Sequence, residues 1–153
     1  MRCYAFTCPH CEFMARVCGT VDHAANCFSI TFVCHDCRTL YDLATHVRLP
    51  ASLALKNRAR DGTLQSRSPR TLEKPEFNSI VPENVHVGEI IINTRPTLPQ
   101  GLLPHNTSLR WVELAPRCPV AAFHKIEPWT HPGRCPRCQI HLDRSLLPFR
   151  TMD

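Results

Sequence analysis

The sequence predicts a small, mainly β protein that bound metal stabilises, and three observations lead to this prediction. The chain has 153 residues with only 7% aromatic residues and 14 prolines, so a large apolar core is not expected. Several of its ten cysteines form C-x-x-C pairs, which is the spacing of metal ligands in small domains. Apolar residues alternate in short runs, with the period of β-strands. We therefore expect two metal-stabilised β units joined by a linker rich in proline and arginine.

Composition divides the chain into four segments. Residues 1–49 and residues 109–145 contain the paired cysteines and the alternating runs, so each is expected to form one β unit. Residues 50–108 are expected to form the linker between them, because proline, serine and arginine are frequent there. Residues 146–153 are a short tail.

In the first unit, two runs predict strands that lead into cysteine pairs. Apolar residues alternate from Tyr4 to Cys8 and again from Phe28 to Cys34. Residues 40–47 are expected to supply a returning strand. Both C-x-x-C pairs would then lie in tight turns where strands end.

Within the linker, two short elements are expected. Residues 51–59 have good helix propensities and a basic C-terminal end, so they predict a short helix. Residues 85–93 contain the most strand-like run of the chain. This strand is expected to pair with a strand of one β unit or with residues 109–114.

Four cysteines of the first unit predict a zinc site: Cys8, Cys11, Cys34 and Cys37. Each C-x-x-C pair places two thiolates in one turn, and four thiolates in tetrahedral geometry suit Zn²⁺. Such a site has no open coordination position and therefore no activated water. Its predicted role is structural.

Two other chemistries use the same pairs of cysteines. Iron in a rubredoxin-like site would use four thiolates for electron transfer, and the spacing leaves this alternative open. The motif Cys8-Pro9-His10-Cys11 also resembles the active site of thioredoxin-fold oxidases, which need a strand before the motif and a helix that begins at its first cysteine. The few residues before Cys8 and the second C-x-x-C pair make metal binding the expected chemistry.

A second zinc site is predicted near the C-terminal end of the sequence. Cys135 and Cys138 form its C-x-x-C pair, and Cys118 is the remaining cysteine of this half. The fourth ligand is expected to be His124, which follows Cys118 closely, with His131 as the alternative. The prediction is therefore two Zn²⁺ per chain, the second held by three cysteines and one histidine.

The C-terminal stretch resembles a ribbon of small, uncharacterised bacterial double zinc-ribbon proteins. The resemblance lies in Cys118-Pro119, in Trp129, and in the knuckle Gly133-Arg134-Cys135-Pro136-Arg137-Cys138. It implies a zinc-ribbon fold but little about function, because zinc ribbons serve many roles.

The chain departs from the usual knuckle at one position. A glycine commonly follows the second cysteine, whereas this sequence has Glu12, Arg38 and Gln139 there. A left-handed backbone is less favourable for these side chains, so a different knuckle geometry is expected.

Three cysteines are left without a metal in this scheme: Cys3, Cys18 and Cys27. They are expected to be buried as small apolar residues, and the alternative is a change of register that makes Cys3 a ligand. Trp111 and Trp129 are expected to be core residues beside the second metal.

The net charge of +5 arises from one segment. Residues 48–74 contain seven basic and two acidic residues, a difference of +5. Zinc ribbons can bind nucleic acid, and basic side chains of this segment could contact phosphates. The candidates are Lys56, Arg58, Arg60, Arg67 and Arg70. No aromatic residues lie among them to stack on bases, so nucleic-acid binding is an alternative to a protein partner.

The sequence contains no recognisable catalytic motif, and no catalytic residue or small-molecule substrate is predicted. It has no signal-like segment and no apolar run of membrane-spanning length, so no membrane association is predicted. A cytoplasmic location is expected, where cysteines stay reduced and bind metal. We expect a non-enzymatic zinc-binding protein that interacts with a protein partner. Nucleic-acid binding and iron-based electron transfer are the alternatives.

Overall fold

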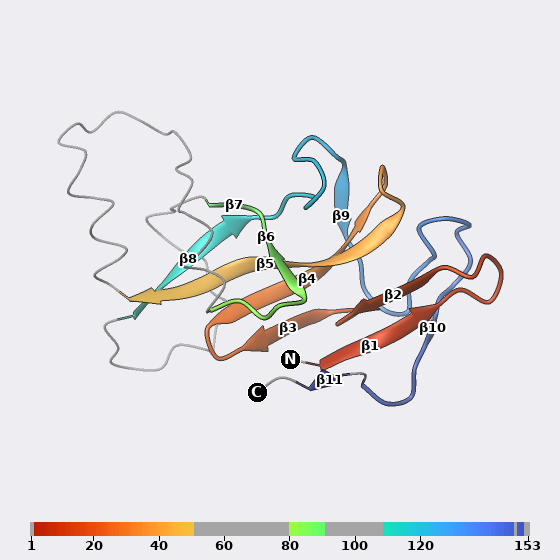
Figure 1. Ribbon diagram of the computed structural model, residues 1–153, viewed down its shortest axis with the longest axis horizontal. Coiled ribbons are helices and arrows are strands. Elements are labelled where there is room, and N and C mark those ends of the chain that lie inside the picture. Colours follow the sequence, from red (N-terminus) through yellow and green to blue (C-terminus); the bar gives the residue numbers. More distant parts are fainter. Residues whose placement is uncertain (1, 51–79, 91–108, 149, 152–153) are drawn as a thin grey trace.

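A computed structural model describes residues 2–50, 80–90, 109–148 and 150–151 of the chain, and Figure 1 shows their arrangement. The described residues form eleven strands and no helix, which confirms the predicted mainly β fold. The part of the chain that the structure describes therefore has no helix able to cross a membrane. The helix predicted at residues 51–59 lies outside the described residues.

The strands follow the chain in numerical order. They are β1 (Arg2–Thr7), β2 (Met14–Val17), β3 (Val21–Ala24), β4 (Cys27–Cys34), β5 (Thr39–Pro50), β6 (Val85–Val87), β7 (Glu89–Ile90), β8 (Leu109–Ala115), β9 (Ile126–Pro128), β10 (Asp143–Arg144) and β11 (Arg150–Thr151).

The smaller sheet is built around β1. The hairpin partner β2 pairs antiparallel with β1, and the short strands β10 and β11 from the C-terminal part also pair antiparallel with it. Alternation explains the hairpin, since Ala15 and Val17 of β2 are buried while Met14 and Arg16 are exposed. The first and last described strands of the chain thus lie side by side (Figure 1).

The larger sheet has the strand order β3-β4-β5-β8-β7. Strand β4 pairs with β3, β5 and β9, and consecutive residues along it are buried, so both of its faces are largely covered. The predicted strand at 85–93 corresponds to β6, which pairs parallel with β5, and β7, which pairs antiparallel with β8. Both of the partners expected for this segment are therefore used.

Strand pairing links the two β units that the sequence predicted as separate segments. β8 pairs with β5 over five residue pairs, β9 pairs with β4, and β10 pairs with β1. The described parts of residues 1–49 and of residues 109–145 therefore both contribute strands to each sheet. The physical reason is that β9 and β10 have only two or three residues and gain hydrogen-bond partners by adding to the longer N-terminal strands.

Gly19 lets the chain pass from the smaller sheet to the larger one. It follows β2 with a φ of 76°, in the left-handed region that favours glycine. A Cβ atom there would collide with the ring of Phe6. The Gly19 carbonyl accepts a hydrogen bond from the His131 backbone N–H at 2.8 Å.

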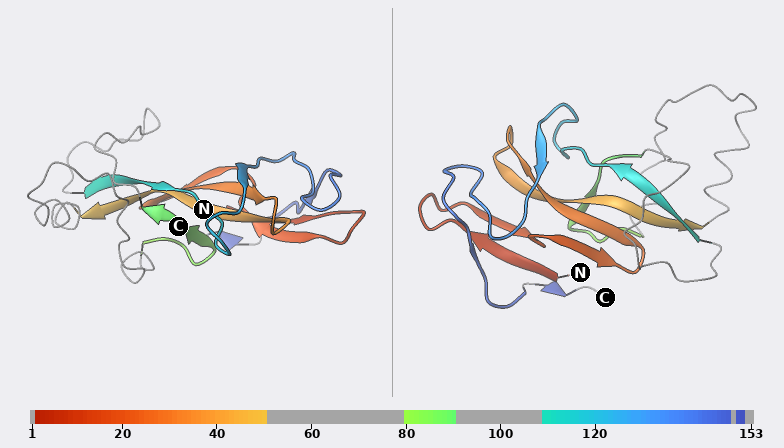
Figure 2. Two further views of the ribbon diagram at one scale, coloured as in Figure 1. Left: turned by 90° about the horizontal axis from the view of Figure 1, so that it is seen from above. Right: turned by 180° about the vertical axis from the view of Figure 1, so that it is seen from behind.

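Two small cores lie where the sheets meet. One gathers Cys3 and Cys18 of the smaller sheet with Val47, Val112 and Leu114 of the larger one. The other forms around a second set of buried residues, which includes Phe6, Phe13, Leu40, Trp129 and Leu142. Figure 2 shows from two further sides that the β1–β2 hairpin lies beside the larger sheet. Neither core is large, in agreement with the low aromatic content.

Replacing Leu114 by alanine tests how firmly β8 is packed. Leu114 is 1% exposed, whereas Leu146 in the C-terminal segment is 99% exposed. We expect Leu114→Ala to lower the free energy of unfolding by about 2–5 kcal/mol through lost burial and a residual cavity. The matched control Leu146→Ala should change it by less than about 0.5 kcal/mol. Urea unfolding followed by tryptophan fluorescence measures both, and equal effects would contradict the described packing.

Candidate metal centres

The eight residues predicted as metal ligands lie in two compact groups. In each group, one ligand atom from each of four side chains lies within 4.8 Å of the others. Cluster A consists of Cys8, Cys11, Cys135 and Cys138, and cluster B consists of Cys34, Cys37, Cys118 and His124.

The structure groups these residues differently from the sequence-based prediction. That prediction combined Cys8 and Cys11 with Cys34 and Cys37, but the two pairs belong to separate clusters. The β1–β2 turn and the β4–β5 turn lie in different sheets, and each meets a C-terminal segment. Thr7, at the end of β1, pairs with Asp143 of β10, which places the segment before β10 beside the β1–β2 turn. Cys34, at the end of β4, pairs with Ile126 of β9, which places the segment before β9 beside the β4–β5 turn.

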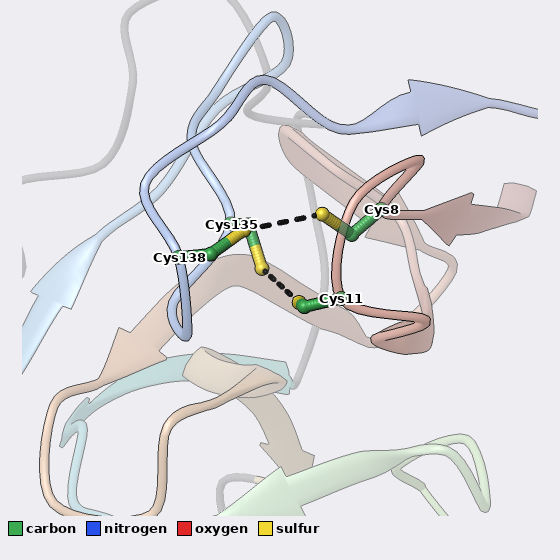
Figure 3. Close-up of side chains that lie close together, drawn as sticks. All are labelled: Cys8, Cys11, Cys135 and Cys138. Atoms are coloured by element: carbon green, nitrogen blue, oxygen red, sulfur yellow. Dashed lines mark hydrogen bonds between the residues drawn. The ribbon is translucent and has the colours of Figure 1, made fainter.

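Cluster A joins the β1–β2 turn to the loop before β10. The sulfur of Cys8 lies 3.3 Å from that of Cys138, and the sulfur of Cys11 lies 3.6 Å from that of Cys135. Figure 3 shows the four side chains pointing toward one another from two segments that are distant in the sequence. The residues that pack around these cysteines form the second of the two cores.

The two turns of cluster A have the same local construction. The backbone N–H of Cys8 donates to the carbonyl of Phe13 at 2.8 Å, and that of Cys135 donates to the carbonyl of Ile140 at 2.7 Å. Each turn therefore closes over its pair of sulfurs.

The expected change of knuckle geometry is wrong. Glu12, Arg38 and Gln139 follow the three C-x-x-C pairs, and their φ angles are 57°, 51° and 65°. All three adopt the left-handed backbone that glycine commonly supplies, at a cost of roughly 1–2 kcal/mol each for a side chain with a Cβ atom. The turns therefore have the left-handed geometry of a glycine-containing knuckle although none of these residues is glycine.

Cluster B joins the β4–β5 turn to the loop that precedes β9. The imidazole Nδ1 of His124 lies 3.2 Å from the sulfur of Cys37, 3.4 Å from that of Cys118 and 3.8 Å from that of Cys34. The sulfurs of Cys37 and Cys118 are 3.6 Å apart. The structure thus places His124 with the three sulfurs.

His131, the alternative ligand, lies outside both clusters. Its ring packs on Phe6 with the centroids 5.5 Å apart, and its backbone N–H is bound to Gly19. It is therefore a packing residue between the two sheets.

Polar contacts outside the ligand set hold the two parts of cluster B together. Asp36, inside the C-x-x-C pair, accepts a hydrogen bond from the backbone N–H of Lys125 at 2.7 Å. The backbone N–H of His35 donates to the carbonyl of Lys125 at 3.0 Å. Sequence reasoning did not predict this role of Asp36. Its position between the two cysteines of a C-x-x-C pair was the available signal.

Glu127, which lies near both histidines in the sequence, forms ion pairs rather than joining a cluster. Its carboxylate lies 3.0 Å from Lys125 Nζ and 3.2 Å from His35 Nε2. The hydrogen bond from Lys125 lowers the pKa of Glu127. Because the Glu127 carboxylate is half exposed, its ion pairs with Lys125 and His35 contribute little to the stability of the fold.

Trp129 is a core residue beside cluster A. It is 6% exposed, and its ring meets that of Phe6 edge to face with the centroids 5.3 Å apart. Its indole N–H donates to the carbonyl of Arg134 at 3.0 Å, so the polar end of the ring is satisfied. Gly133 has no Cβ atom, which leaves room for this ring. The tryptophan therefore supports the turn that contains Cys135.

The electrostatics of the clusters distinguish thiols that ionise readily from thiols that do not. Desolvation acts to raise the pKa of Cys8, but backbone N–H groups of Cys11 and His10 donate to its sulfur and lower the pKa to about 6. In Cys118, desolvation is again outweighed by backbone N–H groups, here of Ala121 and Val120, and the pKa falls to about 7. Each cluster thus contains one thiol that ionises near neutral pH.

Two other thiols of the clusters, Cys37 and Cys138, ionise less readily because they are desolvated and share a site with other sulfurs. Burial and hydrogen bonds with neighbouring thiols raise the pKa of Cys37 to about 11. The backbone N–H of Ile140 acts to lower the pKa of Cys138, but burial and the neighbouring thiols raise it to about 12. Four sulfurs at these distances cannot all be anions unless a cation lies between them.

Both clusters fit a tetrahedral metal ion. A Zn–S bond of about 2.3 Å places two sulfur ligands about 3.8 Å apart, close to the observed separations of 3.3 and 3.6 Å. Four sulfurs, or three sulfurs and one imidazole, are soft donors that suit zinc or iron. The described chain therefore contains two candidate metal-binding clusters that resemble zinc-ribbon units.

Comparisons with protein-family models, with curated proteins and with solved structures found no match to this chain.

Thiol alkylation tests the grouping of the ligands. A metal ion shared by the four cysteines of cluster A would be lost in the variant Cys8→Ser/Cys11→Ser, so Cys135 and Cys138 should react faster with iodoacetamide than in the wild type. The cysteines of cluster B should stay as protected as in the wild type. Peptide mass spectrometry after a timed reaction measures each site. New reactivity at Cys34 and Cys37 would contradict the observed grouping.

Metal affinity should increase with pH. Protons compete with the metal for sulfur, and Cys37 and Cys138, whose pKa values are about 11 and 12, must release their protons when metal binds near pH 7. The affinity of each cluster should therefore rise about tenfold per pH unit for each proton released. Below the pKa of Cys8, about 6, a further proton competes and the dependence steepens. Competition titrations with a chelator at several pH values measure this, and an affinity independent of pH would contradict it.

Proposed function

We propose that the protein is a non-enzymatic zinc-binding protein in which clusters A and B each hold one structural Zn²⁺. One observation carries the proposal, namely that each cluster offers four protein ligand atoms within 4.8 Å of one another. A tetrahedral zinc ion bound in this way has no coordination position left for solvent or substrate. The zinc would hold the fold rather than catalyse a reaction.

The positions of the clusters support a structural role. Cluster A connects cysteines that are 124 and 130 residues apart in the sequence, and cluster B connects residues that are 81 to 90 apart. Structural zinc contributes on the order of 10 kcal/mol or more to the folding of small zinc domains. With two small cores and C-terminal strands of two or three residues, the fold has much to gain from such links.

The proposal extends to a class of protein. Paired cysteines in turns, each with a left-handed residue after the pair, support a relation to zinc-ribbon proteins. Zinc ribbons often act as interaction modules, and we propose this role here. A reducing compartment such as the cytoplasm would keep the thiols available for metal.

Exposed apolar side chains on the metal-bound loops are the proposed contact surface. Val120 and Phe123 lie between two ligands of cluster B and are 67% and 88% exposed. Large apolar side chains on a loop held at both ends lose little conformational entropy when a partner covers them. This arrangement favours a protein partner over nucleic acid, which would be contacted through phosphates and base stacking.

Elemental analysis with paired variants tests the metal proposal. Removing cluster A in Cys8→Ser/Cys11→Ser, or cluster B in Cys34→Ser/Cys37→Ser, should lower the zinc content by one ion per chain in each case. Chelation should unfold the wild type. Iron in place of zinc in cluster A, with the visible absorption of an iron–thiolate site, would favour the rubredoxin-like alternative. A metal content unchanged by both variants would contradict the proposal.

Affinity capture from native cells tests the interaction role. A partner should be recovered by the wild type after nuclease treatment and lost with Val120→Ser/Phe123→Ser. Val21→Ser is the matched control, since Val21 is also an exposed valine, at 57%, but lies on β3 away from the cluster B loop. Recovery that depends on nucleic acid would favour the basic segment instead, whose candidate residues Lys56, Arg58, Arg60, Arg67 and Arg70 lie outside the described residues. Recovery that is unaffected by the loop variant would contradict the proposed surface.

A further inference from the structure

A third group of potential ligands lies between the two sheets, apart from clusters A and B. It consists of Cys3 on β1, Cys18 directly after β2, and Asp42 on β5, whose ligand atoms lie within 4.8 Å of one another. We refer to these three residues as cluster C. All three are buried, with exposed fractions of 4%, 3% and 1%.

Strand register brings the two cysteines together. Tyr4 of β1 pairs with Val17 of β2, so the next residues outward, Cys3 and Cys18, face each other across the hairpin. Their sulfurs are 3.8 Å apart. Two sulfur ligands of one tetrahedral zinc ion are separated by about 3.8 Å, given Zn–S bonds of about 2.3 Å. The spacing in cluster C therefore matches that expected for metal ligands.

The carboxylate of Asp42 is held in place by donors from both sheets. Its Oδ2 accepts a hydrogen bond from the Cys18 backbone N–H at 2.9 Å, and its Oδ1 accepts one from the Thr31 hydroxyl at 2.6 Å. The Thr31 hydroxyl in turn accepts a hydrogen bond from the Gly19 N–H at 2.9 Å, which directs the hydroxyl proton to Asp42. Both carboxylate oxygens thus act as acceptors, as an ionised carboxylate does.

A buried carboxylate is costly unless a cation compensates its charge. Among residues 2–50, 80–90 and 109–148, no basic side chain forms an ion pair with Asp42. The two neighbouring sulfurs add negative charge when they ionise, so they cannot compensate the carboxylate themselves. A divalent cation bound by all three residues would compensate the carboxylate and the thiolates together.

One further contact favours a thiolate in this cluster. The side-chain amide Nδ2 of Asn84, in the turn before β6, lies 2.9 Å from the sulfur of Cys3 and donates to it. An N–H group directed at a sulfur is typical of the surroundings of metal-bound thiolates. Asn84 would thus stabilise the ligand without occupying a coordination position.

We propose that Cys3, Cys18 and Asp42 form a third metal site, which binds a divalent ion of the zinc type through two thiolates and one carboxylate oxygen. This ion would be bound in addition to those of clusters A and B. It would connect the β1–β2 hairpin to β5 at the end of the hairpin opposite cluster A. Because it has three protein ligands rather than four, its fourth position would be filled by solvent.

Cys27 provides the contrast within the same core. Cys27 is 0% exposed and belongs to none of the clusters A, B and C. Its thiol donates to the carbonyl of Phe28 at 3.6 Å. Burial raises the pKa of this thiol to about 12, so it stays protonated. Cys27 is therefore a buried small residue, and it supplies a matched control.

The test is the zinc content of the full-length protein, purified under reducing conditions, saturated with zinc and then freed of unbound metal. We expect three zinc ions per chain for the wild type and for the control Cys27→Ser. The double variant Cys3→Ser/Cys18→Ser should retain two. Asp42→Asn should lose the third ion or bind it at least tenfold more weakly, while the control Asp22→Asn should not. Alkylation of the cluster A and cluster B cysteines checks that the variants keep their folded sites.

The wild type alone keeps the proposal falsifiable if a variant does not fold. Two zinc ions in the wild type, each lost with cluster A or cluster B, would overturn the third site and leave the proposed function in place. No zinc in the wild type would overturn both. A wild-type mass lower by two hydrogen atoms, with Cys3 linked to Cys18 in the peptide map, would show a disulfide at cluster C and also overturn the proposal.

Discussion

The repulsion between neighbouring thiolates is the constraint on which the rest of this structure depends. Cluster A brings sulfurs from the two ends of the chain to within 3.3 and 3.6 Å, and cluster B brings three sulfurs around an imidazole. At such distances, full ionisation requires a cation between the sulfurs. Burial and hydrogen bonds with neighbouring thiols also raise the pKa values of Cys37 and Cys138, which disfavours their anions in the absence of a cation. The way the chain closes on itself therefore brings together sulfurs that a bound cation would stabilise.

This constraint explains how strands of two or three residues can belong to the fold. β9 and β10 bury little apolar surface, and each lies close in sequence to cysteines or a histidine of a cluster. One ion bound by the ligands of each cluster would hold such a segment against the longer strands β4 and β1. The ordered contacts of Asp36 and Trp129 then complete the surroundings of each site. The proposed metal binding and the observed strand pairing would thus stabilise the same segments.

The three groups of potential ligands lie in different parts of the fold and have different proposed roles. Clusters A and B each join a hairpin turn to a loop of the C-terminal part, and Phe123 on the loop before β9 is 88% exposed. Cluster C lies instead between the sheets, where Asp42 and its hydrogen bonds from Cys18 and Thr31 form a polar centre in an apolar core. The proposed interaction surface and the proposed third ion are therefore on different parts of the fold, and a change at one need not alter the other.

Local patterns in the sequence determined the mainly β fold, the positions of β1, β4 and β5, and the eight residues that gather into clusters A and B, because alternation and C-x-x-C spacing are properties of short segments. Only the tertiary structure decided which cysteine pairs meet. That choice depends on β9 and β10, which are too short to leave a pattern, and on which sheet edge accepts them. The left-handed residues Glu12, Arg38 and Gln139 show the same limit, since the site imposes a conformation that their side chains disfavour. Cluster C was hidden for a related reason: Cys3, Cys18 and Asp42 have no common spacing and meet only through strand register and the packing of two sheets.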